Sequence, residues 1–210
     1  MDILGYFAAA VVAYLLGSIP TGYLVARARG VDIRSVGSGN IGATNVFRFL
    51  GKPAGTFVLL VDALKGFVAC KLIPLVLGHE PSFLEYLSIF GGVFAVLGHN
   101  YTCWLHFKGG KGIATSAGVL VGWVPTALLA TLGVWILSFL LGRYVSLASV
   151  LAAAFLPFGV WITQGSVVMI AITAGLSVLA IYKHRANIQR LVGGTEHRVS
   201  FRRPPTASAQ

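Results

Sequence analysis

Six long apolar stretches dominate the 210-residue chain and restrict what it can fold into. They cover residues 3–26, 54–78, 83–105, 113–141, 145–163 and 165–182. A helix that crosses the roughly 30 Å hydrocarbon layer of a bilayer needs about 20 residues, so all six are candidate spans. Backbone polar groups in lipid must pair internally, which leaves helices or closed barrels. Continuous runs such as residues 167–182 lack the alternation of a barrel strand, so we predict an all-α, polytopic membrane helical bundle.

Charge is too scarce for a water-soluble surface. Only 10% of the residues are charged and mean hydropathy is +0.82, whereas soluble domains carry about 25% charged residues. This composition excludes a disordered chain, a soluble α/β enzyme and a secreted cysteine scaffold. The net charge of +10 favours anionic lipid or anionic substrates as partners. We expect no nucleic acid to bind, because nucleic-acid binding needs a basic patch on a soluble body. Both cysteines, Cys70 and Cys103, lie in apolar stretches, so we expect no disulfide, metal site or cofactor.

The distribution of cations predicts the topology. Of the 16 Lys and Arg residues, 14 lie in residues 27–53, 106–112 and 183–210 or at Arg143. Short basic segments stay on the cytoplasmic side of a membrane. An even number of passes must therefore separate residues 106–112 from Arg143.

Residues 113–141 must then break into two passes, and Pro125 makes the segment Gly122–Pro125 the expected break. We predict seven transmembrane helices, with the N-terminus outside and the C-terminus cytoplasmic. Residues 1–201 are expected to form a single membrane domain, and residues 202–210 a disordered cytoplasmic tail.

The first basic connection contains a glycine-rich turn suited to an anion. It reads GSGNIGATN over residues 37–45, and Arg48 follows closely. Glycines among hydroxyl and amide side chains let several backbone N–H groups converge on one phosphate; a flexible polar turn is the alternative. Its G-x-G-x-x-G spacing is no dinucleotide fingerprint, because that motif needs a βαβ unit around it.

The second basic connection reads HFKGGKG over residues 106–112, directly before an apolar helix. Lys108 and Lys111 flank the pair Gly109 and Gly110, so ammonium groups and a helix N-terminus could hold a second anion. Alternatively, the lysines only enforce the positive-inside rule or contact lipid phosphates.

A third polar segment, residues 183–191, continues the last apolar helix past the membrane surface. His184 and Asn187 are three residues apart and share a helix face, and Gly193 with Gly194 is the expected stop. Neighbouring cations favour a neutral imidazole that can accept a proton. An interfacial anchor is the alternative.

Several polar residues also lie inside apolar stretches. Asp62 and Lys65 are i, i+3 partners in the second stretch, and ionisable residues at such depth are either functional or a structural ion pair. His99 and Asn100 are expected to pack or cap. The segment Gly17–Gly22 contains Pro20 and is expected to kink the first helix near the cytoplasmic face.

The polar clusters exclude several reaction classes. Carboxylates are nearly missing from them, which disfavours magnesium-dependent phosphotransfer and two-carboxylate glycosidases. No Cys-His or G-x-S-x-G arrangement is present, so an acyl-enzyme is not expected. Binding of two phosphate-bearing groups at a lipid interface fits the residues that remain.

Several motifs in order resemble those of the bacterial acyl-phosphate-dependent glycerol-3-phosphate acyltransferase family. They are Gly17–Gly22, Gly37–Asn45 with Arg48, Leu50–Lys52, Asp62–Gly66, Gly98–Tyr101, Phe107–Thr115, Arg143–Ser149 and His184–Glu196. The resemblance implies acyl transfer from acyl phosphate to the 1-hydroxyl of sn-glycerol 3-phosphate, giving lysophosphatidate and phosphate, in the bacterial cytoplasmic membrane with the active site on its cytoplasmic face. It also implies a soluble phosphate acyltransferase that supplies the acyl phosphate. The H-x-x-x-x-D acyltransferases have an aspartate five residues after a histidine. No histidine in this sequence is followed by aspartate at that spacing.

The resemblance also implies residue roles. Ser38, Lys108 and His184 are the expected catalytic residues. The expected substrate-binding residues are Gly37, Gly39, Asn40, Gly42, Thr44, Asn45, Arg48, Gly109, Gly110, Lys111, Arg143 and Asn187. Either His184 or the phosphate of the substrate could take the hydroxyl proton. An anion transporter of similar topology and a lipid-binding scaffold are the rival functions.

Overall fold

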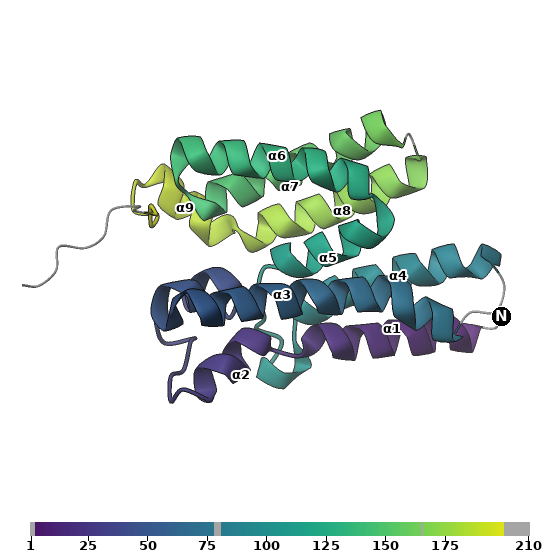
Figure 1. Ribbon diagram of the computed structural model, residues 1–210, viewed down its shortest axis with the longest axis horizontal. Helices are drawn as coiled ribbons and strands as arrows, with labels where there is room; N and C mark the ends of the chain where they lie inside the picture. Colours follow the sequence, from purple (N-terminus) through teal and green to yellow (C-terminus); the bar gives the residue numbers. More distant parts are fainter. Residues whose placement is uncertain (1–2, 78–80, 165, 200–210) are drawn as a thin grey trace, which may run out of the picture. The chain divides into compact units, whose positions relative to one another are not determined.

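The computed structural model describes residues 3–77, 81–164 and 166–199, so the predicted tail at 202–210 lies outside the described residues. Within these ranges every regular element is a helix (Figure 1), which confirms the all-α prediction. The chain divides into two compact units, residues 1–128 and 129–210.

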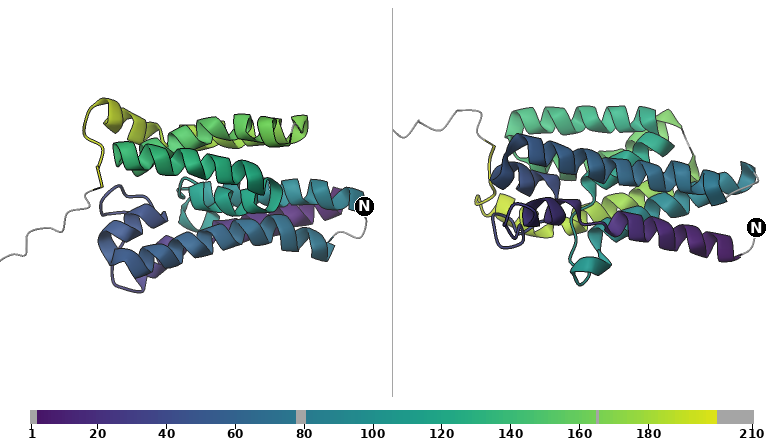
Figure 2. Two further views of the ribbon diagram at one scale, coloured as in Figure 1. Left: turned by 45° about the horizontal axis from the view of Figure 1, so that its top comes forward. Right: turned by 60° about the horizontal axis from the view of Figure 1, so that its bottom comes forward.

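The first unit is built from α1, α3, α4 and α5, with the short helices α2 and η1 between them. Their bounds are α1 Ile3–Ser18, α2 Thr21–Arg27, α3 Ala43–Leu77, α4 Pro81–Asn100, η1 Cys103–Leu105 and α5 Ile113–Trp123. Helix α4 packs against α1 and α3, and α3 also packs against α5. Figures 1 and 2 show α1, α3 and α4 running alongside one another.

Glycines bring the backbones of these helices into direct contact. A Cβ at any of four glycines would collide with backbone atoms of a neighbouring helix: Gly17 with Ala95, Gly98 with Tyr14, Gly66 with Thr115 and Gly118 with Ala63. Apolar side chains gain nothing by leaving lipid for one another, so close packing over small residues supplies the attraction between membrane helices.

The expected kink at Gly17–Gly22 is confirmed as a break between α1 and α2. Helix α1 ends at Ser18 and α2 begins after Pro20, which lacks a backbone N–H. Side chains from elsewhere in the unit supply partners for the freed carbonyls. The Thr102 hydroxyl donates to the Ser18 oxygen at 2.5 Å, and the Lys65 ammonium donates to the Ile19 oxygen at 3.0 Å.

Helix α3 begins earlier than the apolar pattern predicted. Residues 43–53 belong to the first basic connection by composition, yet they are helical, and Gly51 interrupts the helix with φ 81° and ψ 178°. A positive φ is open to glycine at little energetic expense, and Pro53 then restarts the helix in its first turn. Arg48 therefore lies on a helical turn instead of in a loop.

The second unit contains α6 from residue 129 onward, α7, α8 and α9. Helix α6 spans Pro125–Gly142, α7 spans Val145–Thr163, α8 spans Val167–Lys183 and α9 spans Arg185–Val192. Helix α7 packs against α8 and α9, and the Trp135 indole of α6 donates to the Ser149 hydroxyl of α7 at 3.1 Å.

The expectation that residues 183–191 continue the preceding helix is wrong at His184. Helix α9 is bent by 57° from α8 (Figure 2), with His184 alone between them. The predicted stop is confirmed, since α9 ends at Val192 and Gly194 has φ 69°.

Three helical segments in the described residues are long and apolar enough to cross a membrane: Leu4–Arg27, Pro125–Gly142 and Val145–Thr163. The bent pair α8 and α9 would add a fourth if it forms one span. The interruption predicted at Gly122–Pro125 is also present, because α5 ends at Trp123 and α6 begins at Pro125.

Replacing Gly118 by alanine is expected to lower the melting temperature, Tm, of the detergent-solubilised protein. The added methyl group collides with the Ala63 carbonyl, and overpacking of this kind costs about 1–3 kcal/mol. Gly133→Ala is the matched control, because no atom lies within 4 Å of the position its Cβ would take. Alanine is the better helix former, so the Tm of the control should stay level or rise. Equal Tm values for the two variants would contradict the packing described here.

Candidate active site

Asn45 organises the first glycine-rich turn from beneath. Its side chain is buried at the start of α3. The amide nitrogen donates to the carbonyls of Ile33 at 3.2 Å and Val36 at 3.0 Å, while the amide oxygen accepts from the Ser38 N–H at 3.2 Å. One side chain thus bonds to both ends of the segment 33–38. The contacts of Asn45 therefore stabilise the conformation of the turn.

The rest of the turn exposes small polar groups. Gly37 and Gly39 have φ values of 58° and 66°, which residues with a Cβ rarely adopt. Ser38 is exposed between them, and the Asn40 side chain accepts from the Gly42 N–H at 2.9 Å. Thr44 and Arg48 are half-buried on the first turns of α3.

The second basic connection is seated on the C-terminal end of α4. The Gly109 N–H donates to the Asn100 carbonyl at 3.3 Å, and the Gly110 N–H donates to the His99 carbonyl at 3.0 Å. Lys108 is exposed and Lys111 is half-buried on either side of this contact. The glycines allow the seating, since a Cβ at either position would collide with His99.

An apolar cluster joins the two connections within the first unit. Leu105, from the short helix before Lys108, packs with Ile33 and Ile41 of the first connection and with Val46 of α3. The two predicted anion-binding turns are therefore held by the same apolar core. Leu105 lies far from residues 33–46 in the sequence, but it packs in the same cluster in the fold.

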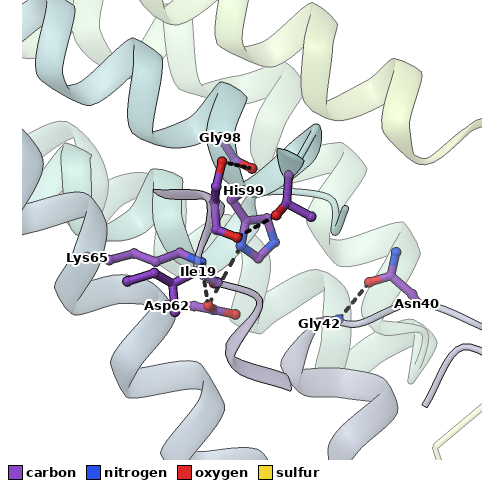
Figure 3. A network of polar contacts seen from close by, with 9 residues as sticks. Ile19, Asn40, Gly42, Asp62, Lys65, Gly98 and His99 are labelled. Atoms are coloured by element: carbon purple, nitrogen blue, oxygen red, sulfur yellow. Dashed lines mark hydrogen bonds and ion pairs between the residues drawn. The ribbon is translucent and has the colours of Figure 1, made fainter. Parts of the chain in front are cut away.

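His99, on which the second turn is seated, also belongs to a buried polar group that contains the i, i+3 pair Asp62 and Lys65. The Lys65 ammonium is 2.8 Å from an oxygen of Asp62, and the two side chains are 4% and 2% exposed. The His99 Nδ1 atom lies 3.7 Å from the same oxygen. Figure 3 shows the three side chains pointing toward one another from α3 and α4.

In the second unit, His184 occupies the bend between α8 and α9. The residue is 3% exposed, and its Nδ1 atom is 2.8 Å from the Ala180 carbonyl oxygen. A carbonyl can only accept, so this contact assigns the proton to Nδ1. In the neutral ring Nε2 is then the acceptor.

Asn187 is held by Glu196, a residue that the sequence reasoning gave no role. The Asn187 amide and the Ser146 hydroxyl donate to one oxygen of Glu196 at 2.7 and 2.8 Å, and Arg190 pairs with the other oxygen at 2.7 Å. The sequence signal that could have identified Glu196 is its charge. It is the last acidic residue and follows a long run of cationic and neutral residues.

The pKa of Glu196 is lowered from its ordinary value. Burial raises it, but hydrogen bonds from Asn187, Ser146 and Arg190, together with the charge of Arg190, lower it by more. The carboxylate is thus ionised and ties α9 to the start of α7.

Arg143 is exposed at the turn between α6 and α7 with φ 63°. Its carbonyl accepts from the Val199 N–H at 2.9 Å, and Arg198 donates to the Gly142 carbonyl at 3.2 Å. The segment after α9 therefore returns to this turn, which brings Arg143 to the same end of the second unit as Glu196.

Helices long and apolar enough to cross a membrane, joined by glycine-rich basic turns, are typical of an integral membrane protein. The family model described as "Glycerol-3-phosphate acyltransferase" matches residues 7–194. The chain therefore belongs to the glycerol-3-phosphate acyltransferase family.

Individual relatives agree with this assignment. Glycerol-3-phosphate acyltransferases of Geotalea daltonii and Geobacter sulfurreducens are 48% and 47% identical, over 88% and 89% of this chain and 93% and 94% of theirs. A crystal structure of PlsY, an integral membrane glycerol 3-phosphate acyltransferase, in its glycerol 3-phosphate form has a TM-score of 0.85 at 41% identity, covering 93% of this chain and 96% of that one. The lysophosphatidic acid form has a TM-score of 0.82 at 40% identity, over 93% and 95%.

Replacing Glu196 by glutamine is expected to lower Tm at pH 7. The charge-assisted bond to Arg190 is lost, and bonds of that kind contribute about 1.5–3 kcal/mol. Because the pKa of Glu196 is lowered in the folded protein, its contribution is complete above the unfolded value near 4.5 and fades as the pH falls through the folded value. Glu85→Gln, at an exposed position of α4, is the control. A Tm difference between wild type and Glu196→Gln that grows below pH 4.5 would contradict this account.

Proposed function

We propose that the protein transfers a fatty acyl group from acyl phosphate to the 1-hydroxyl of sn-glycerol 3-phosphate, forming lysophosphatidate and inorganic phosphate. Family membership supports the acceptor and the acyl transfer. The acyl-phosphate donor is supported by the residues at hand, because two cationic, glycine-rich turns on one core suit two phosphate groups better than a single one.

The chemistry of this donor suits a site built from cations and polar side chains. The hydroxyl oxygen attacks the acyl carbonyl carbon, the bond from that carbon to the bridging phosphate oxygen breaks, and phosphate departs. A phosphate leaving group needs little acid assistance. The protein must mainly align the hydroxyl with the carbonyl and neutralise phosphate charge.

We assign the residues to two phosphate-bearing substrates. Ser38, Arg48, Lys108, His184 and Asn187 are assigned to glycerol 3-phosphate, with His184, Lys108 and Ser38 as catalytic residues. The acyl-phosphate head is assigned to Gly37, Gly39, Asn40, Gly42, Thr44, Lys111, Gly109 and Gly110, and Arg143 adds a cation. Asn45 acts by shaping the turn, as its hydrogen bonds to Ile33, Val36 and Ser38 indicate.

His184 is our candidate for the group that accepts the hydroxyl proton. The contact from Nδ1 to the Ala180 carbonyl leaves Nε2 as the basic atom of the neutral ring. The phosphate of glycerol 3-phosphate could take the proton instead, and His184 would then only bind.

We further propose the bacterial cytoplasmic membrane as the location, with seven spans, the N-terminus outside, and the C-terminus and both turns at the cytoplasmic face. The concentration of Lys and Arg in residues 27–53, 106–112 and 183–210 supports this orientation. A soluble enzyme that supplies acyl phosphate is the proposed partner. The rival function, an anion transporter, would need polar residues through the outer half of the bilayer, where the sequence offers few.

Detergent-solubilised protein is expected to release inorganic phosphate from palmitoyl phosphate only when glycerol 3-phosphate is present. The acyl phosphate bond breaks only on attack by the aligned hydroxyl, so phosphate and lysophosphatidate should appear in equal amounts. Colorimetric phosphate assay and mass spectrometry measure the two products. Phosphate release without an acceptor, or none with it, would reject the proposed reaction.

In the same assay, His184→Ala is expected to lower turnover by about 100-fold or more, as removal of a general base does. An amide variant separates the roles of the two ring nitrogens. His184→Asn keeps a donor near the Nδ1 position toward Ala180 but has no group in place of Nε2, so it should be as impaired as His184→Ala. His197→Ala, at an exposed position, is the control. If His184→Asn turned over saturating substrate at the wild-type rate, His184 would have only a structural role.

Single cysteines at Ser35 and His106 are expected to react with an impermeant maleimide from the same side of the membrane, in a background without Cys70 and Cys103. Both positions are exposed, and they flank the two turns. A cysteine at Gln164, an exposed position between α7 and α8, should react from the opposite side. Labelling of Ser35 and His106 positions from opposite sides would exclude a common cytoplasmic site.

A further inference from the structure

The buried group formed by Asp62, Lys65 and His99 lies outside the residues to which we assign substrate. The group joins residues of two helices, α3 and α4. Asp62 contacts Lys65 at 2.8 Å and His99 at 3.7 Å through the same carboxylate oxygen. Helix α3 is thereby joined to the C-terminal end of α4, because His99 is the second-last residue of that helix.

Lys65 extends this group to the break in the first helix. Its ammonium donates to the Ile19 carbonyl at 3.0 Å, one of the oxygens that the break between α1 and α2 leaves without a helical partner. Figure 3 shows Ile19 beside Lys65 and Asp62. The same carboxylate thus orients two side chains that reach in different directions, one to the helix break and one to the end of α4.

The other side of His99 carries the second glycine-rich turn. The Gly110 N–H donates to the His99 carbonyl at 3.0 Å. A Cβ at Gly110 would collide with the imidazole Nε2, and one at Gly109 with the His99 carbonyl. The ring therefore packs against the backbone of this turn at Gly110.

We propose that Asp62 is a positioning residue for the turn formed by Lys108–Gly112. Asp62 fixes the His99 imidazole, the imidazole and its carbonyl fix Gly109 and Gly110, and these set where Lys108 and Lys111 present their charges. The inference rests on the proposed function, because it takes the turn to bind a phosphate-bearing substrate. It assigns the buried carboxylate a part in substrate affinity, although it touches neither substrate.

Asp62→Asn is expected to raise the KM for glycerol 3-phosphate by about 10- to 100-fold, since a misplacement of about 1 Å can have an effect of that size. The kcat is expected to fall as well, because the same turn carries Lys108, one of the three proposed catalytic residues. Lys71→Met, which removes an exposed cation from the same helix, is the control and should keep the wild-type KM. An unchanged KM in folded Asp62→Asn would overturn the proposal.

An exchange variant separates positioning from a purely structural ion pair. Asp62→Lys combined with Lys65→Asp keeps opposite charges at i, i+3 but removes the carboxylate that faces His99. We expect Tm to recover toward the wild-type value while KM stays raised. Recovery of both Tm and KM would show that the pair only orients α3, and the proposal would be wrong.

If Asp62→Asn does not fold, two substitutions of His99 that have the same shape as each other test the proposal instead. His99→Asn keeps an N–H group near the Nδ1 position, whereas His99→Leu has the same shape without a donor. We expect the KM of His99→Leu to exceed that of His99→Asn by about tenfold, and equal values would overturn the proposal. Turnover by the wild type in the same assay keeps the two hypotheses apart, because its absence would reject the proposed function itself.

Discussion

The structure depends on one constraint: a polar group inside an apolar helical chain must find its partner within the protein. Lipid offers no hydrogen bonds, so each interruption of a helix needs an internal donor or acceptor. The break after Ser18 is the clearest case, since Thr102 and Lys65 donate to the carbonyls of Ser18 and Ile19. Those donors come from distant positions in the chain. Each break therefore also joins segments that are far apart in sequence.

The same constraint shapes the two glycine-rich turns. In the first turn the buried Asn45 amide bonds the carbonyls of Ile33 and Val36 and the Ser38 N–H. The second turn has its glycine N–H groups bonded to the final carbonyls of α4. Both turns leave cations at their edges and rest on the apolar cluster around Leu105. In the reaction that we propose, preorganised positive charge of this kind would stabilise the departing phosphate without rearrangement.

The second unit solves a similar problem with a carboxylate. Asn187 and Arg190 lie on a short helix that is bent away from α8, and alone it would have little to hold it. Glu196 binds both and also binds Ser146 of α7. A single acid among many cations therefore fixes the segment that carries His184 and Asn187, and its ionisation keeps these contacts at neutral pH.

Much of this architecture could be predicted from the sequence. Apolar run lengths and charge scarcity determined the helical membrane class, and Pro20 and Pro125 marked true helix interruptions because proline lacks a backbone donor. Glycine and cation patterns located the candidate turns. The helical state of residues 43–53 was missed, since polar composition reflects exposure near a membrane surface as readily as a loop.

Only the tertiary structure decided which polar groups meet. The grouping of Asp62 with His99, the seating of Gly110 on that histidine and the role of Glu196 all join residues whose distance along the chain carries no periodic signal. Periodicity reports which face of a helix is apolar, but not which helix lies against it. Those pairings depend on how closely glycine-lined backbones can approach, and this is a property of the packed helices together.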